Sequence, residues 1–90
     1  MSRFVLPSKV PGYTIAVGLE RGWFFQVFDN STIDEYGSPF IDEDNVSRSR
    51  MCDLIDEHCD TSAEVVKYVQ ESIAIDVDPN YIKYRSLISK

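Results

Sequence analysis

The residues of this chain best suited to nucleophilic or metal chemistry are Cys52, His58 and Cys59. A Cys–His nucleophilic pair needs the thiol and the imidazole to face each other, with a third group that orients the ring. Neighbours in a helix point about 100° apart, so His58 and Cys59 do not meet this requirement. The three residues also lack the paired spacing of a tetrahedral zinc site. This spacing predicts that both cysteines are buried structural thiols, and that the protein is not an enzyme and uses no metal or cofactor.

The other reactive groups are carboxylates, because the chain has 15 acidic and 9 basic residues and a formal net charge of −6. Ten of the acids lie in residues 29–60, where Arg48 and Arg50 are the only Lys or Arg residues. Binding to a nucleic-acid backbone depends on clustered Lys and Arg, so we expect no direct binding to nucleic acid. Two interpretations of the acidic segment remain open: a solvated surface that aids solubility, or a surface that recognises a basic partner.

Two segments rich in β-branched and aromatic residues, 13–18 and 23–28, flank a short loop between Gly18 and Gly22. This arrangement predicts a β-hairpin. Alternation along the two strands separates two faces. The predicted core face carries Ile15, Val17, Phe25 and Val27.

The second face of the hairpin carries Phe24, Gln26 and Phe28. Either further elements cover these side chains, or the two phenylalanines form an exposed aromatic patch of the kind that marks a binding site. An exposed pair could bind a partner protein or form the seam of a homodimer. The hairpin alone does not decide between these alternatives.

The chain is long enough for one core only. We therefore expect a single domain of three parts: an extended N-terminal arm (1–11), the β-hairpin with an acidic loop (12–41), and a helical part (42–90). Pro7 and Pro11 favour the extended arm, because proline interrupts a helix. The acidic loop could add a short edge strand near Ile33 or Phe40-Ile41.

The first helix is predicted to start near residue 45. Asp44 or Asn45 can cap it, since both side chains accept hydrogen bonds from free backbone N–H groups. Helical periodicity then places Cys52, Ile55 and Cys59 on one buried stripe.

Two further helix starts are predicted later in the chain. Thr61-Ser62-Ala63-Glu64 fits a capping box, and Asp78-Pro79 combines an aspartate cap with a proline in the first turn. The predicted class is α+β: a small antiparallel β-hairpin or three-stranded sheet, followed by two to three α-helices packed on one face.

The hairpin VGLERGWFFQVFD, residues 17–29, resembles that of a loosely defined set of small uncharacterised bacterial proteins. These share a "VG…FFxQVF" hairpin, an acidic stretch and short helices. The resemblance implies a fold and assigns no activity.

These features lead to a functional hypothesis: a small, non-enzymatic, acidic module for protein–protein interaction. The residues predicted to bind the partner are Phe24, Gln26, Phe28, Tyr36, Asp42, Glu43 and Asp44. The alternative is a phage- or plasmid-type inhibitor whose carboxylates imitate nucleic acid and block a nucleic-acid-binding protein. No apolar run approaches the roughly 18–20 residues of a membrane span, and the start of the chain does not read as a secretory signal. We therefore expect a cytoplasmic location.

Overall fold

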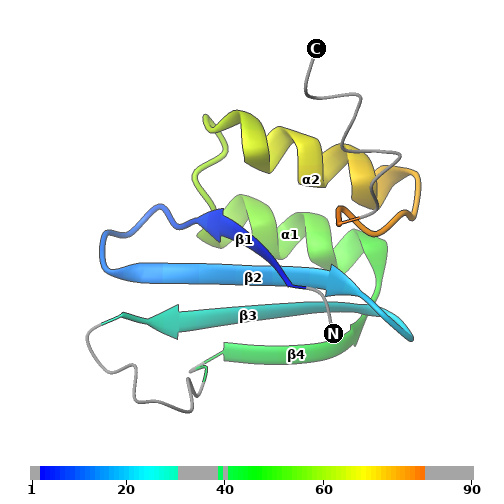
Figure 1. Ribbon diagram of the computed structural model, residues 1–90, viewed down its shortest axis with the longest axis horizontal. Coiled ribbons are helices and arrows are strands. Elements are labelled where there is room, and N and C mark those ends of the chain that lie inside the picture. The colour runs from blue at the N-terminus through cyan, green and yellow to red at the C-terminus, as the bar shows by residue number, and fades with distance from the viewer. Residues whose placement is uncertain (1–2, 31–38, 40, 81–90) are drawn as a thin grey trace.

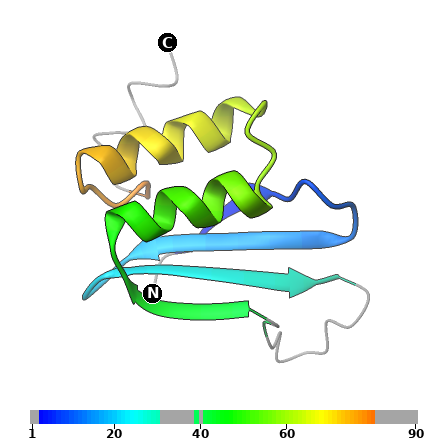
Figure 2. The same cartoon turned by 180° about the vertical axis from the view of Figure 1, so that it is seen from behind.

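The computed structural model describes residues 3–30, 39 and 41–80. Within them the chain forms β1 (Phe4–Pro7), β2 (Tyr13–Leu19), β3 (Trp23–Asp29), β4 (Ile41–Val46), α1 (Arg48–His58) and α2 (Glu64–Ala74). The strands make one antiparallel sheet in the order β1-β2-β3-β4. Both helices lie on one side of the sheet, as Figures 1 and 2 show from opposite directions. The predicted α+β class is confirmed.

The core lies between the sheet and the helices. β2 and β3 pair along their whole length, from Tyr13 opposite Asp29 to Leu19 opposite Trp23. The predicted core face is buried as expected, at Ile15, Val17, Phe25 and Val27. The helices add Met51, Leu54, Ile55, Val66, Val69 and Ile73 to the same cluster. Alternation in the hairpin and helical periodicity therefore converge on one core.

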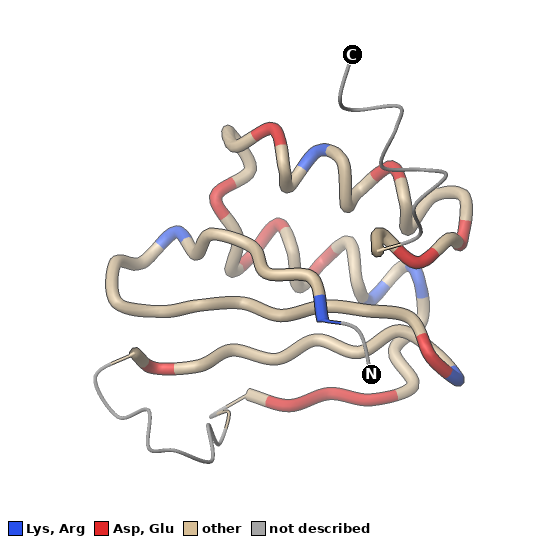
Figure 3. The backbone as a smooth tube through the Cα atoms, viewed as in Figure 1, with Lys and Arg blue, Asp and Glu red and all other residues tan. Residues whose placement is uncertain are grey.

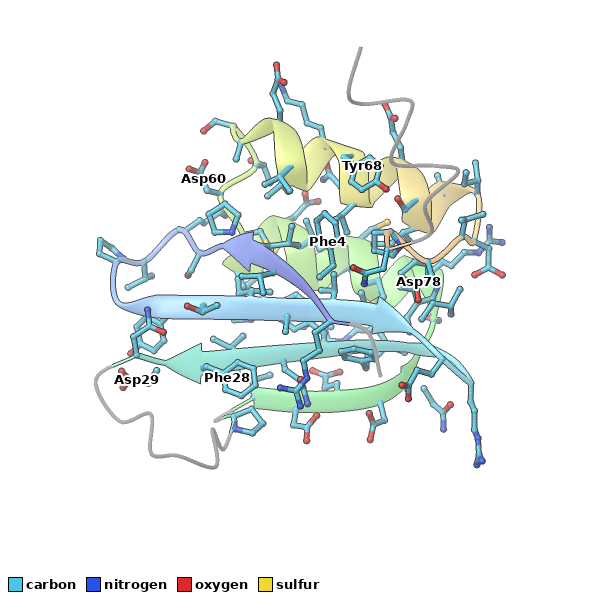
Figure 4. All side chains as sticks on the ribbon, viewed as in Figure 1. Phe4, Phe28, Asp29, Asp60, Tyr68 and Asp78 are labelled. Atoms are coloured by element: carbon cyan, nitrogen blue, oxygen red, sulfur yellow. The ribbon has the colours of Figure 1, made fainter. Side chains whose placement is uncertain are left out.

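The N-terminal arm contains β1, which pairs with β2. Phe4 lies opposite Val17 and Leu6 lies opposite Ile15, so both side chains point towards the helices. The ring of Phe4 lies 5.5 Å from the ring of Tyr68 on α2, between centroids (Figure 4). Through this contact α2 packs against the β1 side of the sheet.

Residues 41–46 form a strand, which corrects the prediction that the helical part begins at residue 42. Aspartate, asparagine and glutamate are depleted in strands, so the acidic sequence gives little sign of β structure. Pairing with β3 overrides this weak local preference. The sheet therefore has a fourth strand, and half of the residues in this strand carry a charge.

The pairing of β4 with β3 contains a β-bulge, in which Asp44 and Asn45 together oppose Phe24. Asn45 adopts a left-handed backbone conformation with φ 51°, which asparagine tolerates better than most residues. Because of the extra residue, Val46 points into the core while Asp44 stays on the opposite side of the strand. Because of the bulge, one short strand places Val46 in the core and Asp44 on the charged outer side.

α1 begins at a serine cap. The hydroxyl oxygen of Ser47 accepts a hydrogen bond from the backbone N–H of Arg50, at 3.1 Å. The predicted cap at Asp44 or Asn45 is therefore wrong, because the bulge of β4 occupies these two residues.

The two cysteines lie in different environments. Cys59 is the C-cap of α1 and is fully buried in the core. Cys52 is exposed, because it follows the buried Met51 and is turned by about 100° around the helix. The predicted stripe shared with Ile55 is therefore wrong for Cys52.

α2 begins without the predicted capping box. Its N-cap is Ala63, which makes no side-chain capping bond. Instead, Asp60 accepts hydrogen bonds from the backbone N–H of Ser62 at 3.1 Å and from its hydroxyl at 2.6 Å. The bond from the Ser62 hydroxyl, followed by that from its N–H, lowers the pKa of the Asp60 carboxyl. The predicted third helix lies largely in residues 81–90, outside the described residues.

Candidate functional site

The face of the sheet turned away from the helices, called here the outer face, carries Phe24, Gln26 and Phe28 from β3. Neither phenylalanine belongs to the core cluster. Both are nevertheless largely buried, with 7% of Phe24 and 8% of Phe28 exposed. Of the two alternatives for this face, the low exposure favours the one in which neighbouring residues cover the two rings.

One of these neighbours is Arg3, which precedes β1. Its guanidinium carbon lies 5.7 Å from the centroid of the Phe28 ring, within the range of a cation–π interaction. Phe28 is labelled on β3 in Figure 4. Val5, on the same face, is 60% exposed. The outer face thus has an apolar part, and a cation already lies over one of its two phenylalanines.

Phe24 lines a cleft between the β2–β3 turn and β4. Two cavities of about 420 and 220 Å³ make up the cleft and share Glu20, Phe24 and Asp44. The smaller cavity is also lined by Asp42 and Arg3. The three carboxylate residues are exposed. We call this feature the acidic cleft: the Phe24 ring surrounded by three carboxylates of the hairpin turn and of β4, with Arg21 also lining the larger cavity and Arg3 the smaller one.

Gln26 of β3 contacts β4 within the acidic cleft. Its Nε2 donates a hydrogen bond to Oδ1 of Asp42, at 3.2 Å. Its Oε1 is buried and accepts no hydrogen bond from the described part of the chain. Buried acceptors without a partner are uncommon in folded proteins.

Glu43 lies on the helix side of β4, opposite the core residue Phe25. Its carboxylate accepts hydrogen bonds from Nε and Nη2 of Arg50, at 3.3 and 3.0 Å. The hydrogen bonds that Arg50 donates to Glu43, followed by the negative charge of Glu43, raise the pKa of Arg50. The acidic run of β4, seen in Figure 3 as a continuous red stretch, is therefore divided between two sides of the strand.

Four of the residues predicted to bind a partner line the acidic cleft: Phe24, Gln26, Asp42 and Asp44. Phe28 shares the outer face but lies beside Arg3, and Tyr36 lies outside the described residues. Sequence reasoning missed Glu20 and Arg3. The position of Glu20 in the hairpin turn was a usable signal, whereas that of Arg3 depends on the pairing of β1.

The thiol of Cys59 and the imidazole of His58 are engaged in packing. Burial raises the pKa of the Cys59 thiol from 9.0 to about 12, so this thiol is protonated and poorly nucleophilic near neutral pH. The ring of His58 lies 5.7 Å from that of Phe25, between centroids. Within residues 3–30, 39 and 41–80, no group of three His, Cys, Asp or Glu side chains is placed to hold a metal ion. No helix in the same residues is long and apolar enough to cross a membrane.

Comparison of the chain with protein-family models found no match, and comparisons with curated proteins and with solved structures also found none. The fold and the site together define a small α+β domain with an acidic, aromatic-lined cleft on the face of its sheet turned away from the two helices. The resemblance of residues 17–29 to small bacterial proteins stays a prediction.

Proposed function

We propose that this protein is a non-enzymatic, cytoplasmic interaction module that binds a basic protein partner through the acidic cleft. The observation that carries the proposal is the placement of Phe24. This ring lies outside the core cluster and lines both cavities together with Glu20 and Asp44. Aromatic residues anchor interfaces, and the charges around them select the partner and speed association.

The chemistry of the acidic cleft suits a positively charged side chain. A guanidinium or ammonium group over the face of Phe24 gains about 0.5–2 kcal/mol from the cation–π interaction. The carboxylates of Asp42 and Asp44 can accept charge-assisted hydrogen bonds from the same group. Because these carboxylates are exposed, they contribute more to the association rate and to salt dependence than to affinity.

An imitation of nucleic acid requires carboxylates arrayed along one surface. β4 favours this alternative less, because Glu43 pairs with Arg50 on the helix side while Asp42 and Asp44 line the acidic cleft. We therefore retain the general interaction module as the proposed function.

The test compares two variants with equal changes in charge. The cleft variant combines Glu20→Gln, Asp42→Asn and Asp44→Asn. The helix variant combines Asp53→Asn, Asp56→Asn and Glu57→Gln, on α1. All six residues are exposed, and exposed substitutions usually change stability by less than about 0.5 kcal/mol each. Both variants should therefore fold.

Tagged wild type and both variants are used to capture proteins from the native lysate, and bound proteins are quantified by mass spectrometry. We expect a basic protein whose recovery falls at least about tenfold with the cleft variant and is unchanged with the helix variant. Equal recovery with the cleft variant and the wild type contradicts the proposed function, as does a partner that only the helix variant loses.

A further inference from the structure

β4 is the last strand of the sheet, and in the described part of the chain no other strand pairs with its free edge. In an edge strand, alternate residues direct their backbone N–H and C=O groups away from the neighbouring strand. Figure 1 shows β4 at the lower edge of the sheet, with α2 beyond the opposite edge. β4 therefore offers backbone hydrogen bonds directly beside the acidic cleft.

A second copy of β4 fits this edge poorly. Antiparallel self-pairing would bring Asp42 and Asp44 of one copy close to the same carboxylates of the other. Like charges that face each other destabilise paired strands, and charged edge strands protect proteins from self-association. The same charges favour a strand that places Lys or Arg beside them.

The outer face already holds one guanidinium group of this chain, supplied from the β1 side of the sheet. Arg3 lies over Phe28 at 5.7 Å and also lines the smaller cavity with Asp42 and Asp44. Phe24 lies on the same side of β3 and faces the acidic cleft. Arg3 therefore shows within this chain how the face accommodates a cation.

We propose that β4 accepts an extended segment of the partner by strand addition, and that this segment carries Arg or Lys at every second position. The inference rests on the proposed function and specifies how the partner enters the acidic cleft. Side chains at every second position of a strand lie on one face, so basic residues with this spacing would lie together beside Asp42 and Asp44. The residues between them would point to the helix side, near Glu43.

The bulge limits the length of this pairing. Regular pairing between β3 and β4 covers Ile41 to Glu43, and Asp44 with Asn45 then interrupts it. Bulges bend an edge strand, so the added strand can make only a short ladder. The partner's affinity must then depend on its charges and on contact with Phe24, which predicts a transient, salt-sensitive interaction.

The test uses two synthetic heptapeptides of identical composition and charge. One alternates, as Arg-Thr-Arg-Val-Arg-Thr-Arg, and the other is blocked, as Arg-Arg-Arg-Arg-Thr-Val-Thr. A third peptide repeats the alternating sequence with N-methyl groups on every second amide, which removes the donors of one edge. Each is titrated into the full 90-residue chain at low ionic strength, followed by backbone amide chemical shifts and hydrogen exchange.

We expect the alternating peptide to bind at least about tenfold more tightly than the blocked and N-methylated peptides, and to slow exchange of alternate amides in β4. Equal affinities, with shifts around Phe24 but no protection in β4, overturn strand addition and leave the proposed function intact. No shift around the acidic cleft with any peptide counts against both. Protection of β4 that depends on protein concentration without peptide identifies a second copy as the occupant and also overturns the inference.

Discussion

The two edges of the sheet are protected in different ways. At the β1 edge, the backbone of the chain itself closes the sheet: the N–H of Asp60 donates to the carbonyl of Pro7 at 3.0 Å, and the N–H of Lys9 donates to the carbonyl of His58 at 2.9 Å. Ser8 also forms a β-bridge with Cys59. At the β4 edge, the described residues provide carboxylates and a bulge instead.

Backbone closure and charge have different consequences for binding. A backbone hydrogen bond within the chain blocks the edge to any added strand, whereas charged side chains repel only an added strand of the same charge. The contacts at the β1 edge therefore stabilise the fold, whereas the charges at the β4 edge select which strand can be added there. Changes near β1 should affect stability, and changes at the outer side of β4 should affect binding.

The largest effect is expected from Leu6→Ala. Leu6 is 1% exposed and lies opposite Ile15, so truncation should cost about 2–5 kcal/mol by leaving a cavity. The adjacent Val5, at 60% exposure, provides the control, since Val5→Ala should change stability by less than about 0.5 kcal/mol. Chemical denaturation measures both. Equal costs for the two substitutions would mean that β1 does not close the core.

A smaller loss of stability is expected from Gly22→Ala, in the β2–β3 turn beside the bulge of β4. A Cβ at this position would lie 2.9 Å from Oδ1 and 3.1 Å from Cα of Asn45. We expect a cost of about 1–3 kcal/mol from this overpacking. The substitution Asn45→Gly removes the side chain and suits the positive φ, so it should recover part of the loss in the double variant. An unchanged midpoint for Gly22→Ala alone would show that the bulge can move freely.

These expectations also show what the sequence could and could not predict. Alternation identified the hairpin and its core face, because each side chain of β2 and β3 meets a partner on the same face. It missed β4, because Asp42 to Asp44 have low strand propensity and become a strand only by pairing with β3. The capping box predicted at Thr61 is wrong. A turn forms there instead, in which Ser62 donates hydrogen bonds to Asp60 and the helix begins after Ala63.

The candidate site was only partly predictable. The acidic cleft needs Glu20 from the turn and Asp44 from beyond the acidic loop, and the sequence does not show that these meet. The burial of Phe28 depends in part on Arg3, which β1 brings across the sheet. Tertiary pairing, rather than any local pattern, assembles these contacts.

The stability of the protein is expected to fall at alkaline pH because of Cys59, which lies beside the β1 edge. Because burial raises the pKa of Cys59 to about 12, the folded state retains a proton that the unfolded chain loses near pH 9. Stability should therefore be unaffected below about pH 8.5 and should fall as the pH rises towards the folded value. Denaturation between pH 8 and 11 tests this, with Cys59→Ala as the comparison. If Cys52→Ser, at an exposed position, removes the dependence instead, the assignment to Cys59 is wrong.

The smallest effect is expected from Glu43→Gln. The ion pair with Arg50 spans 3.0 Å, but the Glu43 and Arg50 side chains are 35% and 48% exposed, so its loss should leave the free energy of unfolding almost unchanged. Because Glu43 lies on the helix side, peptide affinity should also be nearly unchanged, whereas Asp44→Asn should lower it. Calorimetric titration of both variants measures the difference. Equal losses of affinity would mean that the two sides of β4 are not distinct.

The position of Trp23 has a practical consequence. It is the chain's only tryptophan, it is 2% exposed, and it lies opposite Val46 next to the bulge. Its Nε1–H donates a hydrogen bond to Oδ1 of Asp76 at 3.0 Å. Indole fluorescence responds to such a bond and to the polarity around the ring, so a change in the bulge should alter the emission. The unlabelled protein thus contains its own optical reporter for events at the β4 edge.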